Sequence, residues 1–334
     1  MVKIMLENKD SILGYGMYIL DEFEFESGKV LQDVVVEYTI VGTPKYDDDG
    51  NISNAIVYCH NFNGNYSSID DEYQFTCEGG PFDKNDYCFI SISSLGFPGS
   101  CSPSTTGLKH NFPEYTLKDR VNFKRQFLAE KLNMHHVHGI TGTGSGGYEV
   151  YTWACEYPDE MDFIMVGNTS FKTNGYRYVI SKAIDSIIES TDGFYDEIYS
   201  ESLSRVMVSI YRLVYSNYFS KKIFQKMSND EIDVLMDDFV DDGLFTDIYD
   251  FKYRNDCVLN YDIEDKLENI KVKVLVVISN ENMYYIPKYD SFPIEKLVEN
   301  SKVISYESQR DYAHNEDYSS VIDDISEFLD EFKN

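Results

Sequence analysis

The sequence has few basic residues, and this scarcity excludes several classes of partner. Among 334 residues there are 29 Lys and Arg against 58 Asp and Glu, for a net charge of −29. A surface of this charge repels the phosphates of nucleic acids and the head groups of anionic membranes. We therefore expect neither nucleic acid nor membrane as a partner. The same field repels an anionic substrate such as a CoA thioester unless local Lys and Arg offset it.

Long hydrophobic runs are also missing. No window approaches the roughly 20 apolar residues of a transmembrane helix, and residues 1–7 hold too few apolar side chains to predict a signal peptide. The six cysteines show no CxxC or other metal-binding spacing. We therefore expect reduced, mostly buried thiols, no metal site and a cytoplasmic location.

What the sequence does contain is an alternation of apolar strands and amphipathic helices. Hydrophobic residues make up 43% of the chain, enough for a large core. Helical spacing of apolar residues predicts helices at 117–132 and 318–332. Thr116 and Asp119 are placed to cap the first of them. The predicted strands lie at 34–40, 55–59, 87–92, 163–167, 272–278 and 303–306. This order predicts an α/β fold with a mostly parallel central sheet flanked by helices.

Residues of about 171–265 interrupt this alternation, because they are helical in period, acidic and poor in strands. We interpret them as an inserted helical cap, or lid. The core then consists of a first part at 1–170 and a second part at 266–334. The aromatic residues of the cap lie at near-helical spacing, which is typical of core packing or of a dimer contact: Tyr211, Tyr215, Tyr218 and Phe219.

A glycine-rich stretch at 139–147 lies between a β-leaning run and a helical run. Strand, tight glycine turn and helix is the layout of a nucleophile elbow, whose pattern is G-x-S-x-G. The best register here is Gly142-Thr143-Gly144-Ser145-Gly146, which places Gly144 at the nucleophile position and Ser145 one residue later. A positive φ at residue 144 would identify it as the apex of the turn.

Several motifs occur in an order that points to one family. They are His60-Asn61-Phe62-Asn63-Gly64, Phe112 to Asp119, Gly146-Gly147 with Trp153-Ala154, and Ala313-His314-Asn315. In this order the chain resembles the homoserine O-acetyltransferases of the α/β-hydrolase superfamily. The resemblance covers most of the chain and implies the α/β-hydrolase fold and an oxyanion turn at Asn61 and Phe62. It also implies a homodimer through the cap and, in an active member, acyl transfer from acyl-CoA to a hydroxyl such as that of homoserine, with no other cofactor.

Acyl transfer of this kind needs a serine, a histidine and a carboxylate. Counted back from Trp153-Ala154, the nucleophile position of the family holds Gly144. The acid position holds Asn282 or Met283, and His314 alone matches the family. The resemblance therefore implies a degenerate triad, in a protein that acts by binding a small molecule or a partner.

Two other interpretations remain open from the sequence. In the first, Ser145 is the nucleophile of a working acyltransferase or esterase, with His314 as base and a displaced acid such as Glu281, through an acyl-enzyme. In that case Ser145 acts chemically, whereas otherwise its hydroxyl caps the following helix. In the second, the chain is a structural subunit that pairs with an active relative. For the histidines at 135, 136 and 138 we expect packing at a strand end.

Overall fold

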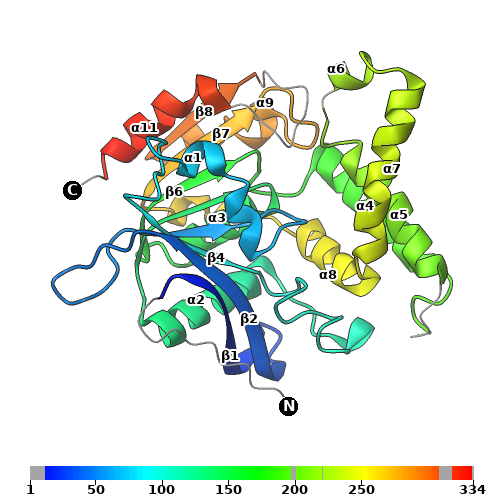
Figure 1. Cartoon of the computed structure of the whole chain (residues 1–334), viewed down its shortest axis with the longest axis horizontal. Helices are drawn as coiled ribbons and strands as arrows, with labels where there is room; N and C mark the ends of the chain where they lie inside the picture. The colour runs from blue at the N-terminus through cyan, green and yellow to red at the C-terminus, as the bar shows by residue number, and fades with distance from the viewer. Residues whose placement is uncertain (1–11, 197–200, 220, 308–317, 333–334) are drawn as a thin grey trace.

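One eight-stranded sheet forms the centre of the molecule (Figure 1). The computed structural model describes residues 12–196, 201–219, 221–307 and 318–332. Along the sheet the strand order is β1-β2-β4-β3-β5-β6-β7-β8. Strand β2 runs antiparallel to both of its neighbours, β1 and β4, and all the other neighbouring strands are parallel. The strands are β1 (Gly14–Glu24), β2 (Val30–Gly42), β3 (Ala55–Cys59), β4 (Cys88–Ile92), β5 (Val137–Thr143), β6 (Met161–Gly167), β7 (Lys273–Ser279) and β8 (Ser301–Tyr306). The predicted fold class is confirmed.

Helices cover both faces of the sheet because the central strands are apolar on both. In β3 every residue is buried, and successive side chains point to opposite faces. Val57 belongs to the hydrophobic cluster that includes α2 and α3, whereas Ile56 belongs to the cluster that includes α11. The helices of the core are α1 (Tyr73–Thr76), α2 (Leu117–Leu132), α3 (Ser145–Glu156), α9 (Pro287–Asp290), α10 (Ile294–Leu297) and α11 (Ile322–Asp330).

The first two strands form a long hairpin that the sequence shows only in part. The prediction of a strand at 34–40 covers the middle of β2, and β1 was not predicted. β1 lies at the edge of the sheet, and three of its apolar side chains, those of Tyr15, Met17 and Ile19, are more than half exposed. Apolar residues on the solvent side disturb the alternation by which a half-buried strand is recognised.

In the described residues between β6 and β7 there are five α-helices, all within the segment predicted as a cap, and Figure 1 shows them grouped beside the sheet. Tyr211 and Phe219 are buried here, and the ring of Tyr215 stacks on Phe239 at 4.5 Å between centroids. These aromatic residues of the cap therefore pack within the chain. The helices are α4 (Gly175–Glu189), α5 (Glu201–Tyr215), α6 (Lys221–Phe224), α7 (Asn229–Phe245) and α8 (Ile248–Leu259).

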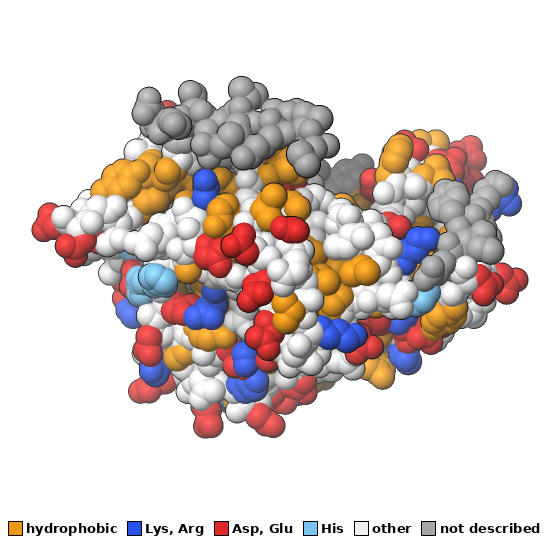
Figure 2. Space-filling model, turned by 90° about the horizontal axis from the view of Figure 1, so that it is seen from below, with side chains coloured by type: hydrophobic (Ala, Val, Ile, Leu, Met, Phe, Trp, Pro, Cys, Tyr) orange, Lys and Arg blue, Asp and Glu red, His pale blue; other side chains and the backbone are white. Residues whose placement is uncertain are grey.

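On the face shown in Figure 2, acidic side chains are scattered with Lys and Arg between them. All six cysteines are unpaired, and five of them are buried, as predicted. In the described part of the chain, no helix has both the length and the apolar character needed to cross a membrane.

The start of α2 is fixed by two reciprocal hydrogen bonds, as the sequence predicts. The hydroxyl of Thr116 accepts from the backbone N–H of Asp119 at 3.1 Å, and the carboxylate of Asp119 accepts from the N–H of Thr116 at 2.8 Å. The other oxygen of this buried carboxylate accepts from the backbone N–H of Glu26 at 2.7 Å. Asp119 thus ties the helix to the turn that follows β1.

We expect Asp119→Ala to lower the free energy of unfolding by about 2 kcal/mol, because it leaves the N–H groups of Thr116 and Glu26 without their acceptor. Urea unfolding followed by circular dichroism measures this change. The control is Glu114→Ala, which removes an exposed carboxylate nearby and is expected to change stability by less than about 0.5 kcal/mol. Equal effects of the two substitutions would contradict the structural role of Asp119.

Candidate active site

Gly144 occupies the sharp turn between β5 and α3. Its backbone angles are φ +55° and ψ −122°, a conformation that L side chains rarely adopt. The turn is fastened on both sides: the N–H of Gly144 donates to the carbonyl of Gly167 at 3.0 Å, and its own carbonyl accepts from the Thr169 hydroxyl at 2.6 Å. By the criterion of a positive φ, residue 144 is the apex of the elbow.

The glycines on either side of the apex fix its register. A Cβ on Gly142 would lie 2.8 Å from the carbonyl oxygen of Cys59, and a Cβ on Gly146 would overlap the same oxygen. Neither residue therefore has room for a side chain. These two positions lie two before and two after residue 144, where the elbow pattern requires small residues. The rival register, centred on Ser145, has Thr143 at the first of these positions.

Ser145 is the first residue of α3. Its side chain is buried, and its Oγ has no hydrogen-bond partner among the protein atoms. The cap residue of this helix is Gly144, which makes no side-chain bond. The expected role of the Ser145 hydroxyl as a helix cap is therefore wrong. Ser145 is one of the residues that line a cavity, while its Oγ is itself enclosed.

The predicted acid position offers no carboxylate. The Oδ1 atom of Asn282 accepts from the backbone N–H groups of Tyr284 and Tyr285, both at 2.9 Å. The carboxylate of Glu281, the candidate for a displaced acid, forms an ion pair with Lys222 of α6. His314 lies outside the described residues. Whether it serves as a base stays a prediction.

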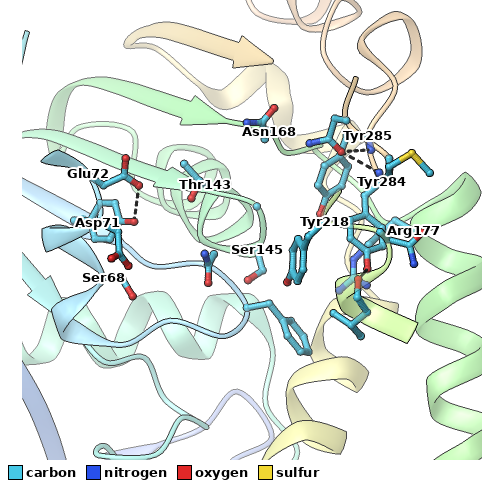
Figure 3. Close-up of a pocket in the computed structure, with 18 of the residues that line it drawn as sticks. Ser68, Asp71, Glu72, Thr143, Ser145, Asn168, Arg177, Tyr218, Tyr284 and Tyr285 are labelled. Carbon is cyan, nitrogen blue, oxygen red and sulfur yellow. Dashed lines mark hydrogen bonds between the residues drawn. The ribbon is translucent and has the colours of Figure 1, made fainter. Parts of the chain in front are cut away.

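One cavity of about 430 Å³ brings most of the predicted site residues together. Figure 3 shows Ser145 and Thr143 between Ser68, Asp71 and Glu72 at one end and Tyr218, Tyr284 and Arg177 at the other. The predicted site residues that line the cavity are Asn61, Phe62, Gly144, Ser145 and Asn282.

The turn that carries Asn61 and Phe62 rests on a buried histidine. His60 is fully buried; its Nε2 accepts from the backbone N–H of Ser94 at 3.0 Å, so its Nδ1 donates to the carbonyl of Asn61 at 2.9 Å. Burial, together with the nearby Lys124, lowers the pKa of His60 to about 3. The ring is thus neutral at physiological pH and acts as a fixed support for the turn.

Beside His60 lies a buried cluster of charges that the sequence did not reveal. The carboxylate of Glu149, on α3, forms ion pairs with Arg120 and, at 2.7 Å, with Lys124; all three side chains are fully buried. The hydroxyl of Ser94 donates to the same carboxylate at 2.9 Å. Burial alone would raise the pKa of Glu149, but the two cations lower it to about 2. Two cations four residues apart on the buried face of α2 are the signal that could have predicted this cluster.

Two of the three neighbouring histidines contact the same carboxylate. His136 and His138 both contact the carboxylate of Asp162, at 2.9 and 2.8 Å. Across the described ranges no group of three or more His, Cys, Asp or Glu residues is placed to hold a metal ion. The contact with Asp162 accords with packing at a strand end.

Comparison with known proteins gives relatives that cover from about half to most of the chain. A protein of Methanothermobacter thermautotrophicus, named as a "probable acyltransferase", is 37% identical over 290 residues, which cover 87% of this chain and 89% of that protein. The homoserine O-acetyltransferase of Sulfurimonas autotrophica is 27% identical over 205 residues, 54% of either chain. No protein-family model matches the sequence.

The chain belongs to the homoserine O-acetyltransferase-like family of the α/β-hydrolase superfamily. Solved structures agree on the fold. Homoserine O-acetyltransferase from Bacillus anthracis superposes with a TM-score of 0.82 at 19% identity, over 96% of this chain and 98% of that one. Esterase E22 gives a TM-score of 0.82 at 17% identity, over 94% and 99%. At such identities these structures speak for the fold alone.

The buried cluster predicts a large effect of Glu149→Gln. Loss of the carboxylate leaves Arg120 and Lys124 without a counter-charge, which should cost about 3–5 kcal/mol of stability. In the native protein this contribution is complete above the ordinary glutamate pKa of 4.5 and is lost as the pH falls toward about 2. Urea unfolding of both proteins between pH 3 and pH 7 measures the difference, which should shrink as the pH falls.

Glu156 on the same helix provides a matched control. Its carboxylate also contacts two lysines, Lys118 at 3.2 Å and Lys266 at 2.5 Å, but the three side chains are 17–52% exposed. Glu156→Gln should therefore cost no more than about 1 kcal/mol. A loss as large as that of Glu149→Gln would show that burial is not the cause.

Proposed function

We propose that this family member binds a small molecule or a partner and does not perform acyl transfer by a Ser-His-Asp triad. The observation that carries the proposal is the conformation of Gly144, which stands at the apex of the elbow with no side chain. Loss of the nucleophile from a triad typically costs about 10⁶ in turnover. The cavity at the elbow is kept, so the capacity to bind is retained where the nucleophile is absent.

The acid position supports the same proposal. Asn282 uses its carbonyl oxygen to bind two backbone N–H groups and has no charge with which to stabilise an imidazolium. The lining of the cavity argues further against acyl-CoA as a co-substrate. Among the described lining residues Arg177 is the sole Lys or Arg, whereas a CoA carries several phosphate charges that need cationic partners.

An active acyltransferase or esterase that uses Ser145 and His314 is the second candidate. It is favoured by Ser145, a residue of the cavity lining whose enclosed hydroxyl has no protein partner, and by the name of the Methanothermobacter relative. Against it stands the geometry of the helix. Successive residues of a helix start point in directions about 100° apart, so a side chain at 145 does not replace one at 144.

The remaining expectations from the sequence stay predictions. They are a cytoplasmic location, a homodimer through the cap, and the division of the chain at residues 170 and 265. The structural-subunit interpretation is compatible with the proposal, since an active relative would then be the bound partner.

A fluorophosphonate, which labels activated serines, tests the proposal directly. We expect no adduct on the native protein by mass spectrometry, and no acetyl-CoA-dependent acetylation of homoserine. Ser145→Ala serves as the matched control and should behave like the native protein. Labelling of Ser145 that disappears in Ser145→Ala would falsify the proposal and establish the second candidate.

The Gly144→Ser substitution tests whether the elbow can still activate a serine at residue 144. A Cβ at residue 144 meets its nearest atom, the Cβ of Asn61, at 3.8 Å, so a side chain fits. The left-handed backbone should cost roughly 1–3 kcal/mol of stability. We expect this variant to gain a fluorophosphonate adduct at residue 144, while Gly144→Ala folds with a similar loss of stability and gains none. An adduct at residue 145 instead would assign the reactive register to Ser145.

A further inference from the structure

Arg177 is a buried cation without a counter-charge. It lies on α4, its residue exposure is 8%, and no hydrogen bond or ion pair joins it to another described residue. Its guanidinium lies 5.5 Å from the ring centre of Phe62 and 5.1 Å from that of Tyr284. Aromatic faces attract a cation, but they compensate only part of the free energy of removing it from water.

The guanidinium faces the cavity. Arg177 lines the cavity, and Figure 3 shows it beside Tyr284 at the end opposite Asp71 and Glu72. The guanidinium nitrogens are not among the buried polar atoms that lack both solvent access and a hydrogen-bond partner. A molecule in the cavity can therefore reach them. Arg is also the side chain whose planar donors match a carboxylate with two parallel hydrogen bonds.

Aromatic residues near Arg177 include Phe62, Tyr284 and Tyr285, within a lining that also holds polar side chains such as Asn217. The hydroxyl of Tyr284 donates to the carbonyl of Val214 at 3.2 Å, and those of Tyr285 and Tyr148 bind each other at 3.1 Å. Because these hydroxyls already have partners, Tyr284 and Tyr285 offer their rings to a ligand. Stacked or edge-on contacts with such rings favour an aromatic molecule.

We infer that the cavity binds a small aromatic monocarboxylate. The carboxylate pairs with Arg177, and the ring packs among the aromatic side chains beside it. This inference names the ligand class of the binding function proposed above and rests on the same cavity.

Isothermal titration of the full chain with 4-hydroxyphenylacetate tests the inference, with 4-hydroxyphenylacetamide as the uncharged analogue. We expect the acid to bind and the amide to bind about 10- to 100-fold more weakly, as for loss of a charged hydrogen bond. Arg177→Met should lose a similar factor for the acid, and Arg177→Lys should restore part of it. The control Arg212→Met removes a half-exposed arginine of α5 that pairs with Asp237, and should leave affinity unchanged.

Stability without ligand separates binding from a structural role. Arg177→Met removes an uncompensated buried charge, so we expect its unfolding midpoint to equal or exceed that of the native protein; a structural arginine would lower it. Three results would overturn the inference: no heat with millimolar acid, equal affinity for acid and amide, or tighter binding of homoserine than of the aromatic acid. Fluorophosphonate labelling of Ser145 would instead contradict the noncatalytic proposal and leave the Arg177 result standing.

Discussion

The close approach of α3 to the end of β3 is the constraint on which the site depends. Because the carbonyl of Cys59 fills the space where Gly142 and Gly146 would carry a Cβ, the chain must turn sharply between them. The turn brings Gly144 and Ser145 to the cavity wall, opposite the loop at Asn61. That loop is held from behind by neutral His60, which lies among the buried charges. The geometry of the elbow is thus set by backbone contacts and not by the residue at its apex.

Under the noncatalytic proposal, this separation explains how the fold can persist without a serine at the apex. A serine at φ +55° and ψ −122° stores strain of roughly 1–3 kcal/mol, which an enzyme tolerates because the strained side chain is the nucleophile. Glycine at residue 144 relieves that strain while the flanking glycines keep the turn. A chain released from selection for acyl transfer would gain stability from this one substitution, consistent with a general trade-off between stability and activity.

The sequence predicts what depends on local pattern and misses what depends on contacts between distant segments. The apolar runs of β3 and β4, the capping pair at Thr116 and Asp119, and the apex at Gly144 follow from spacing alone. The ion pairs of Glu149 do not, since α2 and α3 must pack before their charges meet. Nor does the sequence distinguish Arg177 from the many surface arginines and lysines of a chain; only burial does so.

The acidic surface and the buried arginine act at different ranges. At physiological salt the net charge of −29 is screened within about 8 Å, so it slows the approach of anions without deciding what the cavity holds. Inside the cavity Arg177 is 8% exposed, so it interacts with a carboxylate more strongly than a surface cation does. A ligand with one negative charge is thus repelled weakly outside and held firmly inside. A polyanion such as CoA is repelled more strongly outside and finds Arg177 as the sole Lys or Arg among the described lining residues, which favours a small monoanion over an acyl donor.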